Sequence, residues 1–331
     1  MLSVAGTLAA PFPYFGGKSL ACETVWSVFG MVDNYVEPFA GSAAMLLGAP
    51  DGKRVETIND ADGFVANFWR AVAHDGAAVA AHADWPTNEV DLFARHSWLV
   101  RQTADLTTKL HADPAFYDAK IAGWWCWGAC NWIGSGWCSG TGPWIHDGEG
   151  IVDSRKLPHP SAGRGINRKL PHLGDAGRGE HPRSAYIHEW LGMLQARLRD
   201  VRVTCGDWQR VVKDSVTTRH GLTGLFLDPP YTKGAMDYAV KSTGGPLADQ
   251  VREWCAANGD NKALRIVLCG HAGEHDALVD AGWFAVAWTA RKGYATTDEA
   301  VQNSADETIW CSPYCIRQDA VMRDLFSEET A

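Results

Sequence analysis

Residues 222–231, with the sequence LTGLFLDPPY, decide the fold class of this chain. The first six of these residues are almost wholly apolar, which is typical of a strand buried on both faces of a parallel sheet. Asp228, Pro229, Pro230 and Tyr231 follow the strand directly. Ligands of open α/β sheets bind at the carboxyl ends of the strands. The stretch therefore predicts a buried parallel strand that ends in a binding site.

The tetrapeptide after this strand suits one kind of chemistry. Its two prolines restrict the backbone so that a carboxylate, a carbonyl oxygen and an aromatic ring can face one pocket. An exocyclic amine of a nucleic-acid base has a lone pair that is delocalised into the ring. Hydrogen-bond acceptors on its two N–H groups draw such an amine towards a reactive geometry. A proline turn capped by an aspartate is the structural alternative, and the other motifs of the chain favour the chemical interpretation.

Strands and helices alternate at both ends of the chain. Residues 34–48 (NYVEPFAGSAAMLLG) predict a strand, a glycine turn and the start of a helix, and residues 54–60 (RVETIND) predict a second strand with an acidic end. The further predicted elements are helices at 65–73, 186–199 and 247–257, strands at 201–208 and 264–270, and a terminal antiparallel pair at 283–290 and 306–312. We expect one α/β domain with a Rossmann-like sheet, built from both ends of the chain.

The alternation is interrupted between residues 82 and 185. Residues 124–144 carry six of the sixteen tryptophans, and most of these rings are expected to form the core of a small subdomain. Two similar sequences follow, RKLPHPSAGRG at 155–165 and RKLPHLGDAGRG at 168–179, whose prolines and glycines predict loops or short ribbons. We therefore divide the chain into residues 8–81, an insertion at 82–185, and residues 186–318, of which the first and last form one domain.

The basic residues of the chain are concentrated in the insertion. The formal net charge is −9, but residues 151–185 contain seven arginines and lysines and only three acidic residues. Phosphates are contacted by one face of a protein, so the local charge matters more than the total. This segment is predicted to bind DNA, with a solvated loop as the alternative. The candidate contact residues are Arg155, Lys156, Arg164, Arg168, Lys169 and Arg178.

Three motifs in order, PYFGGK at 13–18, YVEPFAGSAAML at 35–46 and LFLDPPY at 225–231, resemble the Dam-type family of DNA adenine-N6 methyltransferases. The resemblance covers roughly residues 10–75 and 186–315. It implies a methyltransferase sheet with S-adenosylmethionine as the cofactor. The insertion corresponds to the variable target-recognition region of the family, so the resemblance also implies double-stranded DNA as the partner.

The resemblance implies which residues meet the cofactor. The glycine turn of the family holds the methionine end of S-adenosylmethionine, and by motif position this role falls to Glu37, Pro38, Phe39, Gly41 and Ser42. Glycine lets the backbone approach the ligand closely. The first motif lies beside the cofactor in the family, which implies contacts from Tyr14, Gly17 and Lys18. The lysine can alternatively reach towards DNA.

Two acidic positions complete the expected cofactor site. Asp60 ends the second strand, where such folds place an acidic group on the ribose hydroxyls, with Asp62 as the alternative. Asp207 and Trp208 resemble the acidic and aromatic pair of the family, which implies contacts with the amine and the face of the cofactor adenine. The alternative for this pair is a satisfied loop aspartate beside a core tryptophan.

The predicted reaction is methyl transfer to N6 of an adenine flipped out of the duplex. Tyr231 would stack on the base, and the Asp228 carboxylate and the Pro229 carbonyl would accept hydrogen bonds from the amine. Methylation of cytosine N4 is the nearest alternative, because the same pocket chemistry serves that amine. A DNA-binding protein with an inactive core, and methylation of RNA or protein, are the more distant alternatives.

Several other classes are disfavoured. The N-terminal residues join no basic start to a long apolar run, so we expect no signal peptide, no membrane span and a cytoplasmic location. Nine cysteines, an odd number in a long chain, favour reduced thiols. The spacings Cys126/Cys130 and Cys311/Cys315 lack the further ligands of a zinc site, so no metal is expected. GGKS at 16–19 lacks the first glycine of a phosphate-binding loop, because Phe12 stands there, and G-x-G-x-x-G is absent.

Overall fold

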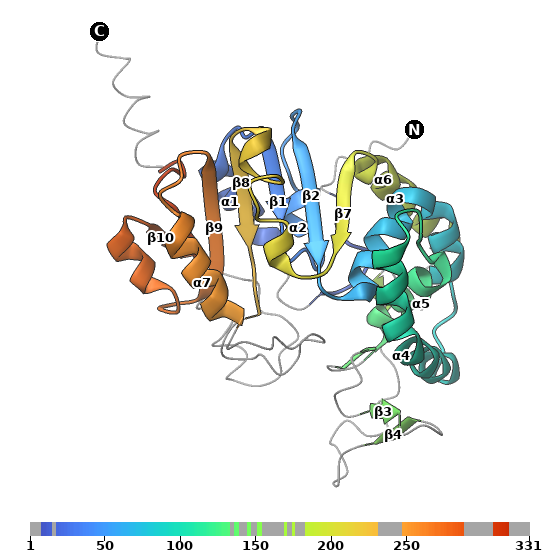
Figure 1. Cartoon of the computed structure of the whole chain (residues 1–331). Coiled ribbons are helices and arrows are strands. Elements are labelled where there is room, and N and C mark those ends of the chain that lie inside the picture. Colours follow the sequence, from blue (N-terminus) through green and yellow to red (C-terminus); the bar gives the residue numbers. More distant parts are fainter. Residues whose placement is uncertain are drawn as a thin grey trace.

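A computed structural model describes residues 8–14, 18–132, 136–138, 144–146, 151–153, 169–170, 174–175, 183–230, 247–287 and 307–317. A seven-stranded sheet with the order β10-β11-β9-β8-β1-β2-β7 lies at its centre (Figure 1). Strand β11 runs antiparallel to both of its neighbours, and the other neighbouring strands are parallel. This is the Rossmann-like α/β sheet with a terminal antiparallel pair that the sequence predicts.

The strands lie where the apolar segments were predicted. Their bounds are β1 Asn34–Glu37, β2 Val55–Asp60, β7 Val201–Cys205, β8 Thr223–Leu227, β9 Leu264–His271, β10 Phe284–Ala287 and β11 Glu307–Cys311. All five residues of β8 are buried. The arrowheads of β2, β7 and β8 point to the lower side of Figure 1, so the carboxyl ends of these parallel strands share one edge.

The sheet is buried on both faces because side chains alternate along each strand. Phe226 of β8 packs into the same core cluster as Val25 and Phe29 of helix α1 (Cys22–Phe29). Leu225 and Leu227 belong to the cluster on the other face, which includes Val251 and Cys255 of helix α7 (Leu247–Asn258). Figure 1 shows α7 in front of the sheet and α1 behind it.

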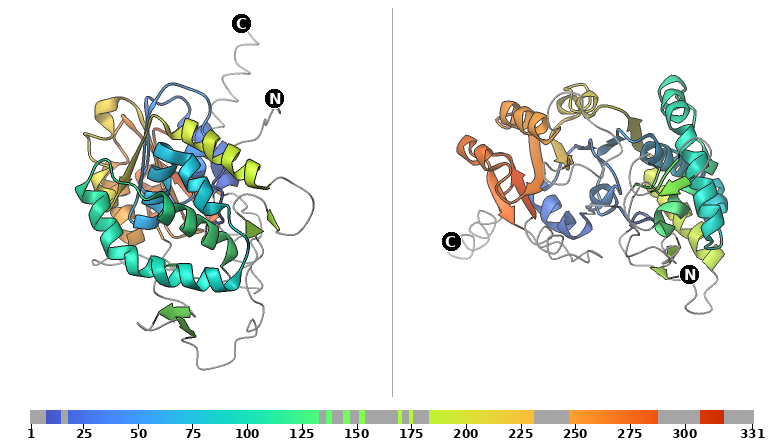
Figure 2. Two further views of the ribbon diagram at one scale, coloured as in Figure 1. Left: turned by 90° about the vertical axis from the view of Figure 1, so that its right-hand side faces the viewer. Right: turned by 90° about the horizontal axis from the view of Figure 1, so that it is seen from below.

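A group of four helices lies beyond β7: α3 Gly63–Ala83, α4 Glu89–Ala112, α5 Ala119–Asn131 and α6 Arg183–Leu198. Helix α3 packs against α5 and α6, and the two views of Figure 2 show the group as a layer beside the sheet. Asp62, Asn88 and Asp118 cap the N-termini of α3, α4 and α5 with side-chain acceptors. The insertion thus contains two regular helices, which the sequence reasoning did not include.

The tryptophan-rich segment forms core, as expected. Trp125, Trp127 and Trp132 are at most 7% exposed. The rest of the insertion contributes two short antiparallel pairs, β3 Trp144–His146 with β4 Ile151–Asp153, and β5 Lys169–Leu170 with β6 Gly174–Asp175. The basic repeats at 155–165 and 168–179 lie outside the described residues, apart from the β5–β6 ribbon.

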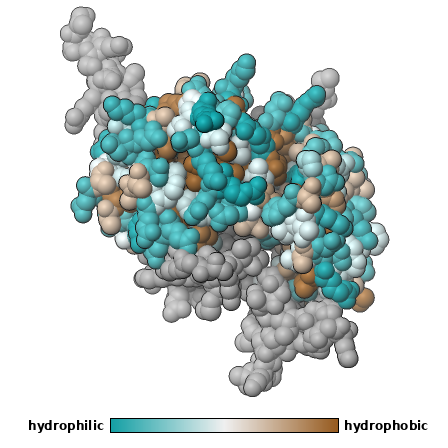
Figure 3. Space-filling model, in the orientation of Figure 1, coloured by the Kyte–Doolittle hydropathy of each residue, from teal (hydrophilic) through white to brown (hydrophobic). Residues whose placement is uncertain are grey.

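The face of the molecule in Figure 3 carries hydrophilic residues with scattered apolar ones. Singly exposed apolar residues are normal on a protein surface. Across the described part of the chain, no helix is both long and apolar enough to cross a membrane. All nine cysteines are buried and none of them is in a disulfide. The described residues contain no cluster of three or more His, Cys, Asp or Glu side chains that could hold a metal ion.

Candidate active site

The carboxyl ends of neighbouring strands bring four acidic residues to one edge of the sheet. Glu37 ends β1, Asp60 ends β2, and Asp228 follows the last residue of β8. Asp207 comes two residues after β7. Since β7, β2, β1 and β8 are consecutive in the sheet, these residues lie side by side along the edge. The predicted cofactor and catalytic residues thus meet where an open α/β sheet binds ligands.

The glycine turn after β1 is held in one conformation. Gly41 has a φ of +46°, a region that disfavours side chains, and a Cβ there would lie 2.4 Å from the Tyr14 ring. The Gly41 amide donates to Asp60 Oδ2 at 2.9 Å, and Trp69 Nε1 donates to the Gly41 carbonyl at 2.8 Å. Pro38 is buried, whereas Phe39 and Ser42 are half-buried. Tyr14 and Asp60 therefore fix the turn that is predicted to receive the cofactor.

Glu37 is a carboxyl group buried at 2% exposure. Its Oε2 accepts hydrogen bonds from the Tyr35 hydroxyl at 3.1 Å and the Leu46 amide at 3.3 Å. Burial raises the pKa of Glu37 to about 8, and these hydrogen bonds only partly oppose the rise. A cationic group bound beside Glu37 would favour its ionised form.

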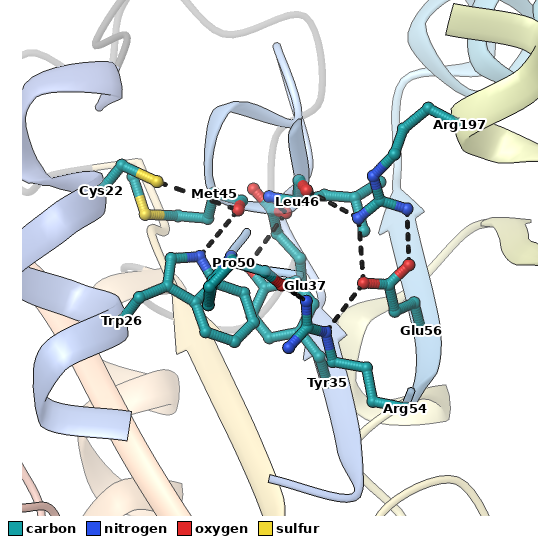
Figure 4. Close-up of polar contacts among 10 residues, drawn as sticks. All are labelled: Cys22, Trp26, Tyr35, Glu37, Met45, Leu46, Pro50, Arg54, Glu56 and Arg197. Carbon is teal, nitrogen blue, oxygen red and sulfur yellow. Dashed lines mark hydrogen bonds and ion pairs between the residues drawn. The ribbon is translucent and has the colours of Figure 1, made fainter. Parts of the chain in front are cut away.

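The turn is supported from behind by a polar network (Figure 4). Arg197 of α6 makes a two-point ion pair with Glu56 of β2, at 2.6 and 2.9 Å, and also donates to the Leu46 carbonyl at 2.8 Å. Arg54 contacts Glu56 from the other side at 3.0 Å. Trp26 of α1 donates to the carbonyl of Met45. These contacts tie the short helix α2 (Ala44–Leu47) to β2, α1 and α6.

Asp60 has a structural role that the sequence did not reveal. Its Oδ2 accepts from Gly41 and its Oδ1 accepts from the Asp62 amide at 2.9 Å. Burial, followed by the charge of Asp62, raises the pKa of Asp60 to about 7. Asp62 itself caps α3 by accepting from the Phe64 amide at 2.8 Å. The ribose contact predicted for Asp60 stays a prediction, and the hydrogen bond to Gly41 already links the residue to the cofactor turn.

The aromatic part of the expected adenine subsite consists of two rings. Trp208, in the short helix η2 (Trp208–Arg210), is 3% exposed, and its ring centroid lies 6.0 Å from that of Phe39. Phe39 is half-buried, so it offers the more accessible ring. Asp207 is exposed and accepts from the Gln209 amide at 2.8 Å. The contacts of Asp207 and Trp208 with adenine stay predictions.

The candidate catalytic aspartate is paired with a buried lysine. Lys18 is 4% exposed, and its Nζ lies 3.2 Å from Asp228 Oδ2 and 3.5 Å from Glu307 Oε2. Burial alone would lower the pKa of Lys18, but the charges of Asp228 and Glu307 outweigh it and raise the pKa above its ordinary value. Lys18 therefore remains a cation that connects the first motif to the strand end of β8.

Glu307 is a site residue that sequence reasoning missed. It begins β11, is 12% exposed, and its pKa is raised by burial, against the effect of Lys18. Glu307 is an acidic residue at the start of an apolar strand, and this sequence pattern predicts partial burial of its side chain. Nothing in the sequence pairs it with Lys18, which lies 289 positions earlier.

The structure describes some of the remaining predicted residues and not others. Pro229 is buried and Pro230 is half-buried beside Asp228. Tyr231 and Gly17 lie outside the described residues, as do Arg155, Lys156, Arg164, Arg168 and Arg178. Lys169 is described only as part of the backbone of β5.

The site fits S-adenosylmethionine by the chemistry of its groups. The methionine end of this cofactor carries an ammonium group and a sulfonium centre, and the strand ends supply carboxyl groups and the half-buried ring of Phe39. The Gly41 turn leaves no space for a Cβ because the Tyr14 ring packs against it, so the turn keeps the backbone conformation that places it beside the ends of β1 and β2. A Rossmann-like sheet with this edge is compatible with the class of S-adenosylmethionine-dependent methyltransferases.

The comparisons with known proteins place the chain within this class. Residues 14–102 match the family model described as D12 class N6 adenine-specific DNA methyltransferase. The match contains the Gly41 turn, Lys18, Asp60 and the helix α3. No curated protein matches the chain. The protein is an S-adenosylmethionine-dependent enzyme that methylates N6 of adenine in DNA, and the cytosine alternative finds no support.

Proposed function

We propose that the enzyme acts on duplex DNA and turns the target adenine out of the helix into the pocket after β8. The observation that carries this proposal is the placement of Asp228 at the carboxyl end of a buried strand, next to the end of β1 with its cofactor turn. The N6 amine of a paired adenine lies inside the stack, where no side chain after β8 could surround it. Enzymes that modify such atoms extrude the nucleotide.

In this proposal the Asp228 carboxylate and the Pro229 carbonyl accept the two hydrogens of the adenine amine. Tyr231 stacks on the base. Lys18 holds the Asp228 carboxylate in position through the 3.2 Å ion pair, so that the carboxylate acts chiefly by orienting the amine. S-adenosylmethionine supplies an electrophilic methyl group. Orientation and fixed charges then provide most of the rate, as expected where the protein forms no covalent intermediate.

The cofactor is proposed to lie along the ends of β1, β2 and β7. Glu37 would face its cationic methionine end, beside the turn of Pro38, Gly41 and Ser42. The ribose would lie near Asp60. The adenine ring would lie against the aromatic surface of Phe39 and Trp208, with Asp207 accepting from its amine. The carboxyl groups of this edge support the assignment, because they complement the charge of the ligand.

Target recognition is proposed to reside in residues 82–185, inserted between the two catalytic segments 8–81 and 186–318. Basic charge supports this division, because phosphate contacts dominate DNA affinity. The proposed contact residues are Arg155, Lys156, Arg164, Arg168, Lys169 and Arg178. Recognition of a specific sequence would follow from base contacts made by the same segment.

The decisive experiment is transfer of labelled methyl from S-adenosylmethionine to unmethylated duplex DNA, with mass spectrometry of the nucleosides and mapping of the modified positions. Asp228→Ala is expected to lower kcat at least 100-fold while cofactor binding, measured by calorimetry, stays within about threefold. Lys109→Ala serves as the control, because Lys109 is exposed on α4. Near-normal turnover of Asp228→Ala with bound cofactor would refute the assignment.

Base extrusion is tested separately with 2-aminopurine at the target position. The fluorescence of this base rises when it leaves the stack, so binding of the enzyme with S-adenosylhomocysteine should increase it several-fold. Asp228→Ala should retain the increase if stacking on Tyr231 drives it. An unchanged signal in a complex shown to be bound by gel shift would contradict extrusion.

A further inference from the structure

A second binding site lies in the helical layer, away from the strand ends. An open pocket of about 470 Å³ is lined by the end of α3, the loop that follows it, α4 and α5. Its walls include the indoles of Trp85, Trp98 and Trp124, together with His82, Asp91, Arg95 and Arg101. This volume is typical of small-ligand sites. We call this set of residues the tryptophan cage.

The position of the cage separates it from the methylation chemistry. Helix α3 begins at the strand end that carries Asp60 and reaches the cage at its other end, near His82. The helix is kinked at Asp75, whose backbone is non-helical, and none of the residues that line the cage belongs to a strand end or to the Gly41 turn. An occupant of the cage is therefore neither the target adenine nor the cofactor.

Arg95 gives the cage a polar centre. Its guanidinium lies 4.4 Å from the ring centre of Trp127 and 4.8 Å from those of Trp85 and Trp124. The side chain is 5% exposed, and within the described residues its Nη1 has no hydrogen-bond partner. Burial lowers the pKa of Arg95 to about 10, which leaves it charged at neutral pH. A buried donor without an acceptor is costly, so this geometry suits a ligand that supplies one.

The charge around the cage selects the sign of that ligand. Arg101 is exposed at the rim, and Lys120 lies 4.6 and 4.4 Å from the ring centres of Trp98 and Trp124. Asp91 is the acidic residue of the lining, and its Oδ2 already accepts from Trp85 Nε1 at 2.6 Å and from Asn88 at 2.7 Å. Three cations would repel a cationic guest of the aromatic walls. The three cations favour an anionic ligand, and the indoles and the Arg95 donor favour one that also contains a flat ring with hydrogen-bond acceptors.

We propose that the tryptophan cage binds a nucleotide. The base stacks on the half-buried indole of Trp98, to which the Trp124 ring lies edge-on at 68°, and any base offers a flat face for this contact. Acceptor atoms on the edge of the base accept a hydrogen bond from Nη1 of Arg95. The phosphate contacts Arg101 and Lys120 at the rim. Trp85, which is 44% exposed, also lines the pocket. The nucleotide is either free in solution or an unpaired unit of a DNA strand, and both sources present the same chemistry.

The test uses the full chain saturated with S-adenosylhomocysteine, so that the cofactor site cannot take up the probe. One probe is the 5′-monophosphate of 2-aminopurine deoxyribonucleoside, and the other is a duplex with 2-aminopurine in an unpaired overhang. Saturable quenching of either probe is expected. Trp98→Ala and Arg101→Ala should each weaken its binding about tenfold, in line with the loss of one stacking or phosphate contact. Arg219→Ala is the control, because Arg219 is an exposed arginine that lies before β8 and does not line the cage.

Each outcome has a defined meaning. Binding of the mononucleotide supports a free ligand, and binding of the overhang alone supports a DNA strand. Absence of saturable binding of both probes, or binding that Trp98→Ala and Arg101→Ala leave unchanged, would overturn the proposal. Methyl transfer to blunt duplex DNA is measured on the wild-type protein of the same preparation. A failure of the catalytic assignment would therefore be visible independently.

Discussion

Two buried cations have contrasting environments. Lys18 lies at the catalytic edge, which is the edge of the sheet where Glu37, Asp60, Asp207 and Asp228 follow the strands, and Arg95 lies in the tryptophan cage. They are 4% and 5% exposed. Lys18 lies between two carboxylates, whereas three indole rings surround the Arg95 guanidinium, which forms no ion pair within 4 Å among the described residues. A buried charge needs a partner or a strong local reason to remain. Lys18 therefore holds carboxylates of the protein in position. The surroundings of Arg95 instead favour a role in binding a ligand.

The largest expected effect is at Lys18. Lys18→Met leaves Asp228 and Glu307 partly buried, close together and without their cation, so the free energy of unfolding should fall by about 3 kcal/mol. Urea unfolding with circular dichroism measures this. Lys109→Met removes an exposed ion pair with Asp105 and should cost less than about 0.5 kcal/mol. Equal effects of the two substitutions would contradict the role given to Lys18.

A smaller loss of stability is expected for a substitution in the Gly41 turn. Gly41→Ala combines a φ of +46° with a contact of 2.4 Å to the Tyr14 ring, and should lower stability by about 2 kcal/mol. Calorimetric cofactor affinity should fall at least tenfold in the same variant. Gly192→Ala, in the middle of α6 with open space around it, is the control and should stabilise by about 0.5–1 kcal/mol.

Cofactor binding should depend on pH through Glu37. The pKa of this carboxyl is about 8, so the free protein holds it mostly protonated at neutral pH, and a cationic ligand needs the ionised form. Affinity should rise with pH up to about 8, by at most tenfold per pH unit. Glu37→Gln should flatten the profile between pH 7 and 8, while Asp60 continues to titrate near 7. Glu23→Gln, on the exposed face of α1, should leave the profile intact. A pH-independent wild type would rule out the proposed contact.

The catalytic edge was predictable from the sequence because local signals mark it. The apolar run before Asp228 fixes a buried strand, and the glycine turn after Glu37 fixes the neighbouring strand end. Parallel pairing then brings the two together without further information. The link of Lys18 to Glu307 was not predictable, since it depends on the antiparallel insertion of β11 beside β9.

The tryptophan cage was not predictable for a different reason. Its residues come from three segments whose contact depends on helix packing, and the sequence reasoning assigned no helix to 89–112. A signal was present, because Asn88 followed by Glu89 and Asp91 is typical of a helix N-terminus, and the structure shows Asn88 capping α4. The packing of Arg95 among three indoles has no comparable local signal.

The smallest effect on the free energy of unfolding is expected for Arg95→Met, the counterpart of the Lys18 substitution. Arg95→Met removes cation–π contacts, which contribute about 0.5–2 kcal/mol, together with a buried unpartnered donor that costs about 1–3 kcal/mol. The two changes should nearly cancel, so the free energy of unfolding should shift by less than about 1 kcal/mol. Added 2-aminopurine nucleotide should raise the Tm of the wild type and not that of Arg95→Met, because a ligand stabilises only the form that binds it. A loss of 3 kcal/mol or more in Arg95→Met would instead make the guanidinium a structural support of the helical layer, equivalent to Lys18, and would remove the reason to expect a guest in the cage.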